Sequence, residues 1–332
     1  MNSRRVTIID VAKEARVSIA SVSRFLNNPS ILRKENREKI SQAIKKLNYH
    51  PLIHARRLAG GKLNSFGLII PGYEGIFYSF YALEIIRNVG LALERKGIDL
   101  HLHIFWHKDN FNTSLVDGVI FADIIDNKLQ LERLLKENLP SVVINKKIEN
   151  TKVSFVAVDN FKGAYEATDF LIKHGHKRIA HLAGDLNVQC AQERLEGYRE
   201  ALKKNNIKIE NSYVKVANFS RVLAREKLQE LFSLPKIPTA IFSASDDMAQ
   251  EALNFANEKE IKVPDKLSII GFDDNPHCIY GNFALTTVRQ PLGKMAYSAV
   301  EILKDLVDKK DTSLKKIILS PELVIRDTVS FI

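Results

Sequence analysis

The sequence predicts an N-terminal all-α head with a helix-turn-helix, followed by an α/β core of two lobes built on parallel sheets. Residues 1–62 hold 14 Lys and Arg against 4 Asp and Glu, whereas the rest of this 332-residue chain carries 35 of each kind. From residue 65 onward, short apolar runs alternate with amphipathic segments, the pattern of buried parallel strands joined by helices. A basic head on a neutral body indicates a separate module that binds a polyanion.

Three short helices are expected in the head. Thr7 precedes an apolar face of helical spacing, and Asp10 follows three residues later as an acidic form of the capping box. After a three-residue break, Ser18 can cap a second helix, and a third helix supplies the apolar face on which the first two pack. The expected helices span residues 8–15, 19–26 and 33–47.

The second helix leaves small and polar side chains toward solvent, among them Ala20, Ser21 and Ser23. Such a surface can lie deep in the major groove of DNA, where Arg24 reaches guanine acceptors or a phosphate. A three-helix bundle that simply has a polar face is the alternative, and these residues alone leave both interpretations open.

Three stretches of the head carry a further signal: residues 7–12, 17–27 and 37–51. They closely resemble the headpiece of the LacI/GalR family of repressors, in which the residues matching Ile19 and Ala20 select the operator and the one matching Arg24 contacts a base. Arg16 stands where the family usually has Gly, and a left-handed backbone at this position costs a non-glycine residue about 1 kcal/mol. The resemblance implies double-stranded operator DNA as a partner and these contact residues: Thr7, Ser18, Ile19, Ala20, Ser21, Ser23, Arg24 and Asn27.

Residues 51–62 have the composition of a short helix ended by a glycine pair, too short to be stable in isolation. The same resemblance makes this segment a hinge helix that enters the minor groove together with the hinge of a second protomer. Ala55, Arg56 and Leu58 would then contact DNA, with Leu58 wedged into the central base step. Leu52 replaces the Asn that is common in the family, which removes a polar contact.

In the body, strands and helices can be followed as far as residue 272. The expected strands span residues 66–71, 98–105, 116–121, 141–145, 155–158, 179–183, 213–216, 240–243 and 267–272. Helices are expected to end near residues 96, 138 and 232 and to span residues 163–174, 193–205 and 248–259. In folds of this class, ligands bind at the carboxyl ends of the strands, here in a cleft between the lobes.

The body also resembles the periplasmic-binding-protein-like core of the same family. The matching stretches are residues 174–180, 193–198, 246–249, 270–274 and 285–291. The resemblance implies a head over residues 1–50, a hinge over 51–62, and an effector-binding and dimerisation core over 63–332. Within the core, the first lobe would span about 63–157 and 289–317, and the second about 158–288 and 318–332.

Several loops of the second lobe converge on the expected cleft. Arg194 opens a helix, Asp273 ends a strand and Phe219 follows another, so together they offer a polyol charge-assisted hydrogen bonds and an aromatic face. An unpaired arginine in such a cleft would have little structural reason, whereas Asp246 has an equal alternative as the cap of the helix near residue 248. The matching family positions imply that an effector site is lined by Arg194, Asp273, Phe219, Ser245 and Asp246. Asn145, at the end of its strand, and Tyr73 are candidates from the first lobe.

Two features near the first-lobe side of the cleft stay open. The aromatic run Phe77, Tyr78, Phe80 and Tyr81 either lines the cleft or faces the core. Only residues 106–115 connect two parallel strands where the family has a longer loop and a helix, so at most one helical turn is expected there.

Several classes of protein are disfavoured. There is no Gly-x-Ser-x-Gly, His-Glu-x-x-His, Walker loop or Gly-rich dinucleotide turn, so no enzyme activity, cofactor or metal is expected. Cys190 and Cys278 lack the spacing of a disulfide framework or zinc site and are expected to be packed. No apolar run is long enough for a membrane span and no signal peptide is present, so we expect a cytoplasmic protein.

The resemblance as a whole implies a homodimeric repressor of sugar uptake or catabolism genes, released from a pseudo-palindromic operator by a small sugar-type effector. Two alternatives stay open. One is the same dimer controlled by a nucleobase corepressor or a protein partner. The other is a nucleoid-packaging protein, which would leave the neutral body unexplained.

Overall fold

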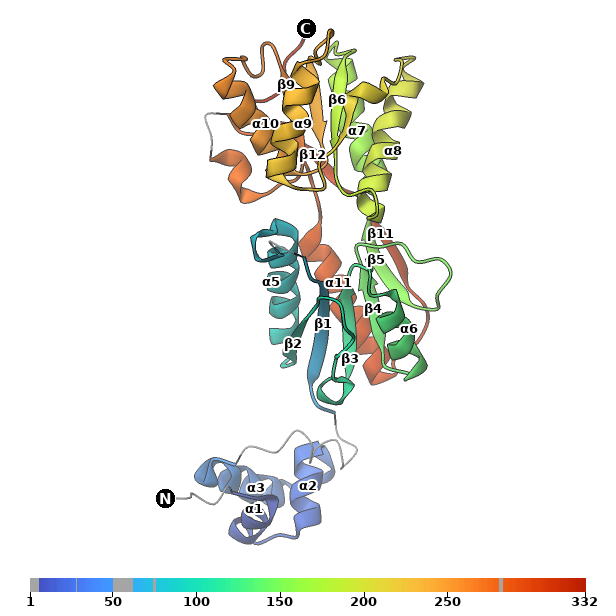
Figure 1. Ribbon diagram of the computed structural model, residues 1–332. Helices are drawn as coiled ribbons and strands as arrows, with labels where there is room; N and C mark the ends of the chain where they lie inside the picture. The colour runs from blue at the N-terminus through green and yellow to red at the C-terminus, as the bar shows by residue number, and fades with distance from the viewer. Residues whose placement is uncertain (1–5, 28, 50–61, 74–75, 281–282) are drawn as a thin grey trace.

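The computed structural model describes residues 6–27, 29–49, 62–73, 76–280 and 283–332. Three helices form a head at one end, and two α/β lobes follow, with the chain ending on the far side of the second lobe (Figure 1). This architecture confirms the fold class expected from the sequence. Within the described part of the chain, no helix is long and apolar enough to cross a membrane.

The head consists of three helices and a 3-10 turn: α1 (Ile8–Ala15), α2 (Ile19–Asn27), η1 (Pro29–Ile31) and α3 (Lys34–Leu47). The expected capping interaction is present, since the carboxylate of Asp10 accepts the N–H of Thr7 at 2.8 Å and the Thr7 hydroxyl at 2.6 Å. Ser18 caps α2 by accepting the N–H of Ser21 at 3.2 Å. A small core holds the helices together: Val11, Ala12, Ala15, Val22, Ile40, Ala43 and Tyr49.

Arg16 follows α1 in the left-handed conformation, with φ 53° and ψ 45°. Because glycine adopts this conformation without steric cost, Arg16→Gly is expected to raise the free energy of unfolding of the head by up to about 1 kcal/mol. Hydrogen exchange of the α1 amides in the full-length protein measures the gain. Arg16→Ala keeps the backbone strain and is the control, so an equal gain from alanine would contradict the backbone explanation.

Each lobe contains one six-stranded sheet. In chain order the first sheet holds β1 (Ser65–Pro71), β2 (Asp99–Phe105), β3 (Gly118–Ala122), β4 (Ser141–Ile144), β5 (Ser154–Val158) and β11 (Lys316–Leu319). The second holds β6 (Ile179–Ala183), β7 (Val214–Val216), β8 (Ala240–Ser243), β9 (Ser268–Asp273), β10 (Thr286–Arg289) and β12 (Glu322–Val324). Their spatial orders are β11-β5-β4-β3-β1-β2 and β12-β10-β9-β8-β6-β7, and every pairing is parallel except β10 with β12.

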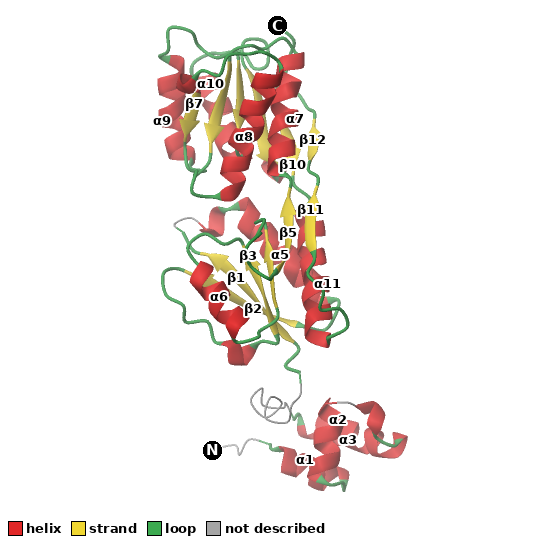
Figure 2. Ribbon diagram, turned by 90° about the vertical axis from the view of Figure 1, so that its right-hand side faces the viewer, coloured by secondary structure: helices red, strands yellow, loops and turns green. Residues whose placement is uncertain are grey.

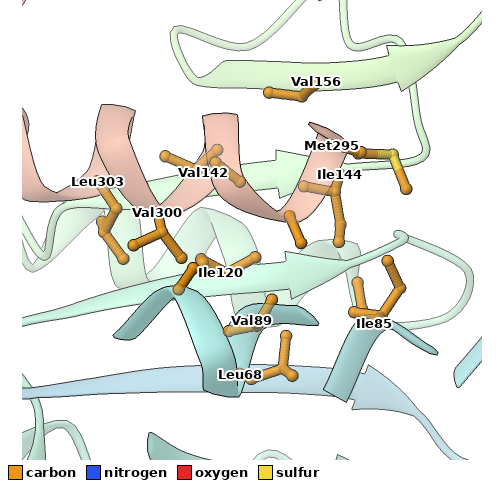
Figure 3. Close-up of a cluster of buried hydrophobic side chains, with 14 of the residues drawn as sticks. Leu68, Ile85, Val89, Ile120, Val142, Ile144, Val156, Met295, Val300 and Leu303 are labelled. Carbon is orange, nitrogen blue, oxygen red and sulfur yellow. The ribbon is translucent and has the colours of Figure 1, made fainter. Parts of the chain in front are cut away.

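Helices cover both faces of each sheet, as strands with apolar residues on both sides require. In the first lobe, α5 (Phe80–Glu94) and α11 (Leu292–Asp308) pack on one face and α6 (Lys128–Lys136) on the other. Figure 3 shows the larger of these layers, where Leu68 and Ile120 of the sheet meet side chains of α5 and α11.

The second lobe has the same construction. Its sheet lies between α7 (Asn160–Lys173) with α8 (Gln189–Lys204) on one face and α9 (Arg221–Phe232) with α10 (Asp246–Glu258) on the other (Figure 2). Short 3-10 turns complete the described elements: η2 (Ile76–Tyr78), η3 (Thr113–Leu115), η4 (Asn211–Tyr213) and η5 (Pro276–Ile279).

The chain passes between the lobes three times, after β5, after β10 and after β11. The last two passages place α11 and β11 in the first lobe and β12 in the second. Sequence reasoning did not identify α11, although Leu292, Met295, Ala299 and Leu303 are buried at helical spacing.

The short crossover after β2 contains only the single turn η3, as predicted. The ring of Phe111 takes the place of a covering helix, and it lies so close to β1 that a Cβ atom on Gly67 would be 2.8 Å from its Cζ atom. Strand β2 stays at the edge of the sheet, with Leu102 and Trp106 exposed.

Candidate functional site

Helix α2 packs by one face and leaves the other open. Val22 is fully buried, whereas Ile19 is 48% exposed. This is the arrangement that a helix needs in order to enter a groove of DNA while it stays attached to its own domain. The side chains of α2 that were predicted to contact DNA are exposed or half-exposed: Ile19, Ala20, Ser21, Ser23 and Arg24.

Some of the remaining predicted DNA contacts lie among the described residues and others do not. Thr7 and Ser18 are exposed and their hydroxyls take part in the two helix caps. The side chain of Asn27 and the hinge residues Ala55, Arg56 and Leu58 lie outside the described residues, so their contacts stay predictions.

Immediately after the hinge, the chain is fastened to the base of the first lobe. The carboxylate of Asp117 accepts the N–H of Leu63 at 3.0 Å and that of Asn64 at 2.8 Å. Lys62 pairs with Asp308 at the end of α11, and this contact contributes most to lowering the pKa of Asp308 to about 2. A displacement of the first lobe therefore moves the end of the hinge.

Arg194, only 3% exposed, is held by its own lobe. Its Nε donates to Oδ1 of Asn160 at 3.0 Å and its Nη1 to the carbonyl of Ala244 at 2.6 Å. The guanidinium carbon lies 3.7 Å from the centre of the Phe272 ring, and Nη1 is 3.9 Å from Oδ1 of Asp273. The expectation of an unpaired arginine is therefore wrong, because four groups of the second lobe fix this side chain.

Asp273 ends β9 with φ 131°, a backbone conformation that L side chains rarely adopt. Its Oδ1 accepts a hydrogen bond from Nε2 of Gln290 at 2.6 Å. Burial raises the pKa of Asp273 above its ordinary value; the Arg194 cation opposes this shift and the Asp246 carboxylate adds to it. Backbone strain together with a perturbed carboxyl group is typical of a functional site.

Ser245 and Phe219 have local structural roles. Ser245 caps α10 by accepting the N–H of Met248 at 3.4 Å. Phe219 lies across the end of β6, where a Cβ atom on Gly184 would be 2.1 Å from its ring. Glycine at this position is therefore what lets the aromatic ring come so close to the backbone.

Asp246 is neither a helix cap nor a free carboxylate. It accepts the N–H of Asn275 at 2.7 Å, the hydroxyl of Thr287 at 2.5 Å and the thiol of Cys278 at 3.1 Å. The proposed capping role of Asp246 is wrong, since α10 begins at this residue and Ser245 caps it. Asp246 instead holds the loop after β9 against β10.

A cavity of about 290 Å³ opens at the carboxyl edge of the second sheet. Burial raises the pKa of Asp247, which faces this cavity, while Arg221 and His277 oppose the shift. Neither Arg194 nor Asp273 lines it, so the cavity lies beside the predicted anchors. Its lining residues are Arg221, Asp246, Asp247, Gln250, Asn275, His277, Cys278 and Tyr280.

Asn145 and Asp123 form a buried pair in the first lobe. Asn145 follows β4 with φ 63° and is 6% exposed, and its Nδ2 donates to Oδ2 of Asp123 at 3.1 Å. Asp123 follows β3 with φ 88°, and burial raises its pKa to about 6. Sequence reasoning missed Asp123, although its place directly after a buried strand was an available signal.

Tyr81, in the first turn of α5, reaches the boundary between the lobes. Burial raises the pKa of Tyr81 well above its ordinary value. The charged groups that act on it come from both lobes, namely Asp123 from the first and Arg194 from the second. Tyr81 also packs against the first-lobe core, so it faces that core and lies near the charged groups of the lobe boundary.

The other aromatic residues of this region differ in their exposure. Phe77 and Tyr78 are exposed, and Phe80 packs against the first-lobe core. Tyr73 is partly exposed; burial raises its pKa, and the carboxylates of Asp247 and Asp273 add to the shift. Tyr73 thus lies near the second lobe, as an effector contact would require.

A polar bridge joins the lobes beside these residues. The N–H of Lys147 donates to Oε1 of Gln189 at 2.7 Å, and Nε2 of Gln189 donates to the carbonyl of Lys147 at 3.3 Å. Nζ of Lys147 lies 3.1 Å from Oε1 of Glu193, and Nδ2 of Asn160 donates to Oε2 of Glu193 at 3.4 Å. Because Asn160 also holds Arg194, the bridge connects the first lobe to the predicted anchor.

Three buried polar atoms at this boundary have no hydrogen-bond partner among the described residues: the hydroxyl of Tyr81, Oδ1 of Asn145 and Oε1 of Gln290. An unsatisfied buried polar atom costs about 1–3 kcal/mol, so these three atoms are candidate ligand contacts. We call the following six residues the interlobe site: Tyr81, Asp123, Asn145, Arg194, Asp273 and Gln290. Among the described residues, no group of three or more His, Cys, Asp or Glu could hold a metal ion.

The chain matches two family models. Residues 7–52 match bacterial regulatory proteins of the lacI family, and residues 168–329 match a periplasmic binding protein-like domain. The probable HTH-type transcriptional repressor ExuR of Bacillus subtilis is 32% identical over 332 residues, which is 98% of each chain. The HTH-type transcriptional repressor PurR of Histophilus somni is 33% identical over 333 residues, 97% of this chain and 98% of the relative.

Solved structures agree with these matches. The transcriptional regulator CelR in complex with cellobiose has a TM-score of 0.75 and 26% identity, covering 98% of this chain and 100% of that one. The lac repressor dimer bound to operator and the anti-inducer ONPF has a TM-score of 0.86 with the same coverage, and at 24% identity it supports the fold. This chain belongs to the lacI family of bacterial regulatory proteins and is a DNA-binding transcription regulator.

Proposed function

We propose that this regulator is a homodimeric repressor that binds a pseudo-palindromic operator and leaves it when a small sugar-type effector binds at the interlobe site. The observation that carries the effector proposal is the set of three unpartnered buried atoms. Tyr81 and Asn145 contribute two from the first lobe, and the third belongs to Gln290, which follows β10 of the second sheet and donates to Asp273. The similar regulator CelR was solved as a complex with cellobiose, which supports a sugar-type effector. We infer that the protein acts on DNA in the cytoplasm, at the nucleoid, and that it has no enzyme activity.

We propose that successive parts of the chain have separate roles. The head over residues 1–50 reads the operator through α2, and the hinge over 51–62 joins it to the core over 63–332. The first lobe, expected over about 63–157 and 289–317, carries the hinge. Its second segment is shifted by a few residues, because β10 of the second sheet ends at Arg289 and β11 of the first sheet ends at Leu319. The second lobe over about 158–288 and 318–332 holds the effector anchors.

Coupling between effector and DNA runs through the first lobe. A ligand that contacts Tyr81 and Asn145 on one side and Gln290 on the other favours one relative position of the lobes. The hinge end is fastened to the first lobe by Asp117 and Asp308, so this preference reaches the DNA-binding segment. A differential affinity of about 3 kcal/mol for the two lobe positions changes operator occupancy about a hundredfold.

Exposed apolar residues supply a surface for the second protomer. On α5, Leu83 and Leu91 are exposed, and Leu102 is exposed on the neighbouring edge strand β2. In the second lobe, Ile279 and Tyr280 form a further exposed apolar group. Apolar groups on both lobes suit an interface that runs along the core and sets the two heads at a fixed spacing.

Sedimentation of the full-length protein, alone and with an operator selected from random DNA, tests the proposal. A dimer is expected that binds the selected sequence at least about a thousandfold more tightly than random DNA at the same salt concentration. A monomer that binds both DNAs equally, with one salt dependence, would instead support the nucleoid-packaging alternative.

The effector is tested by thermal denaturation with sugars and nucleobases, followed by operator binding for each compound that stabilises the protein. A sugar that raises the melting temperature and weakens operator binding supports the proposal. A nucleobase that stabilises the protein and strengthens operator binding would instead support the corepressor alternative. If neither sugars nor nucleobases stabilise the protein, a protein partner is favoured.

A further inference from the structure

We propose that the base of the first lobe is a second DNA-binding surface, on which lysines beside the end of the hinge neutralise phosphates of the DNA backbone. The partner is the backbone on either side of the groove that the hinge enters, whatever its base sequence. This inference rests on the proposed function, because it takes the hinge to lie on DNA.

The lysines lie at the end of the first lobe that faces the hinge. Strand β1 begins at Ser65, directly after the hinge, and every strand pairing in this sheet is parallel. The start of β11 at Lys316 therefore lies at the same end of the sheet as Ser65. Helix α11 ends at Asp308 and leads into β11, so residues 304–316 lie at the base of the lobe (Figure 1).

The chain that comes from the hinge touches this segment directly. Lys62 pairs with Asp308, and the same carboxylate lies 2.9 Å from Nζ of Lys304 and 3.8 Å from Nζ of Lys310. Lys62 and Lys304 lower the pKa of Asp308 to about 2, so the carboxylate stays ionised. It can balance only one of the three positive charges that surround it.

Positive charge is in excess at this place. Residues 304–316 together with Lys62 hold six lysines and three aspartates, whereas residues 63–332 as a whole are neutral. Lys309, Lys310 and Lys316 are exposed, and among the described residues neither Lys309 nor Lys316 has an ion-pair partner. We call Lys62, Lys309, Lys310 and Lys316 the basal lysines. Exposed lysines in excess on a neutral core suit a polyanion.

Chain length brings the basal lysines within reach of the operator. Lys62 follows Leu58 by four residues, and four residues of chain span at most about 14 Å. With Leu58 wedged into a base step, the base of the lobe is held close to the minor groove, which is about 6 Å wide and bordered by phosphates. Long lysine side chains can reach those phosphates, and the two protomers of the proposed dimer make each contact twice.

The salt dependence of operator binding tests the inference on the full-length protein. A triple variant carries Lys309→Asn, Lys310→Gln and Lys316→Gln; asparagine is used at 309 because this residue has a left-handed backbone, with φ 55°. The slope of log affinity against log salt is expected to become shallower by at least about 2, and affinity to fall at least about tenfold at about 50 mM salt. An unchanged slope overturns the inference.

Three lysines of the second lobe give a matched control. Lys177, Lys236 and Lys266 are exposed and come shortly before β6, β8 and β9, at the end of the second lobe that faces away from the first. Their replacement by glutamine makes the same change in net charge and should leave the slope as it is in the wild type. An equal loss from the control would show that the net charge of the core sets the affinity, and it would overturn the inference.

Asp311→Asn is expected to have the opposite effect. It removes a negative charge from the base of the lobe and frees Lys315, whose Nζ lies 2.7 Å from Oδ2 of Asp311. Operator binding should tighten about threefold at about 50 mM salt, and the gain should vanish at about 1 M salt, where charges are screened within a few ångströms. Weaker binding, or a gain that persists at high salt, would contradict a contact with phosphates.

Affinity cleavage locates the contact. Because Cys190 and Cys278 are buried, an iron–EDTA reagent can be attached to a cysteine introduced by Lys310→Cys. It is expected to cut the operator backbone near its centre, whereas the same reagent at Lys177→Cys should not. If the wild type selects an operator and neither variant cuts it, this inference fails and the proposed function stands. If the wild type selects no operator, the proposed function fails, and this inference fails with it.

Discussion

Arg194→Ala is expected to lower the free energy of unfolding of the core by about 3–5 kcal/mol, the cost of removing one partner from a buried charged network. The substitution leaves the carbonyl of Ala244 and Oδ1 of Asn160 without a donor, and it exposes the face of Phe272. Urea denaturation, monitored by circular dichroism, measures the loss.

Arg199→Ala is the matched control for this change. Arg199 lies on the same helix but is exposed, so its removal is expected to change stability by no more than about 0.5 kcal/mol. A similar small loss for Arg194→Ala would contradict the buried network. The large expected loss also means that this variant is a poor probe of effector binding, since failure to bind and failure to fold would look alike. Tyr81→Phe is a better probe, because it removes only a hydroxyl that has no partner among the described residues.

Leu58→Ala is expected to weaken binding to the selected operator about a hundredfold while binding to random DNA changes little. A leucine wedge unstacks a central base step, which costs free energy. Only on the bent operator do added protein–DNA contacts offset this cost. Equilibrium binding to both DNAs at one salt concentration provides the measurement.

Arg57→Ala gives the comparison for Leu58, because the loss of one positive charge in the same segment should weaken binding to both DNAs alike. The two variants therefore distinguish a wedge from a charged tether. Equal losses on operator and random DNA for Leu58→Ala would mean that the segment acts only as a tether.

The elements that follow from local pattern were predictable, and those that depend on neighbours were not. The capping interaction of Thr7 and the cap at Ser18 require only residues three positions apart, and both are present. The left-handed backbone at Arg16 could likewise be expected from the end of an amphipathic helix. The single turn at residues 113–115 followed from the length of the crossover alone.

The side-chain partners of the interlobe site could not be read from order along the chain. Nothing local indicates that Asp246 would accept hydrogen bonds from Thr287 and from the loop after β9, far along the sequence. Arg194 was expected to open a helix, but α8 begins at Gln189 and Arg194 lies in its second turn. Its partners Asn160 and Ala244 come from two other segments. The site residues therefore remain proposals whose roles depend on three-dimensional contacts.

The three passages of the chain between the lobes set the order in which the molecule can be completed during translation. The sheet of the first lobe lacks β11, and that of the second lacks β12, until the last part of the core has left the ribosome. The basic head is finished far earlier and can fold while both sheets still have open edges. A nascent chain thus has a folded DNA-binding head before its effector-binding core is complete. Under the proposed two-headed recognition, a single nascent head would bind DNA too weakly to silence a gene before its own switch exists.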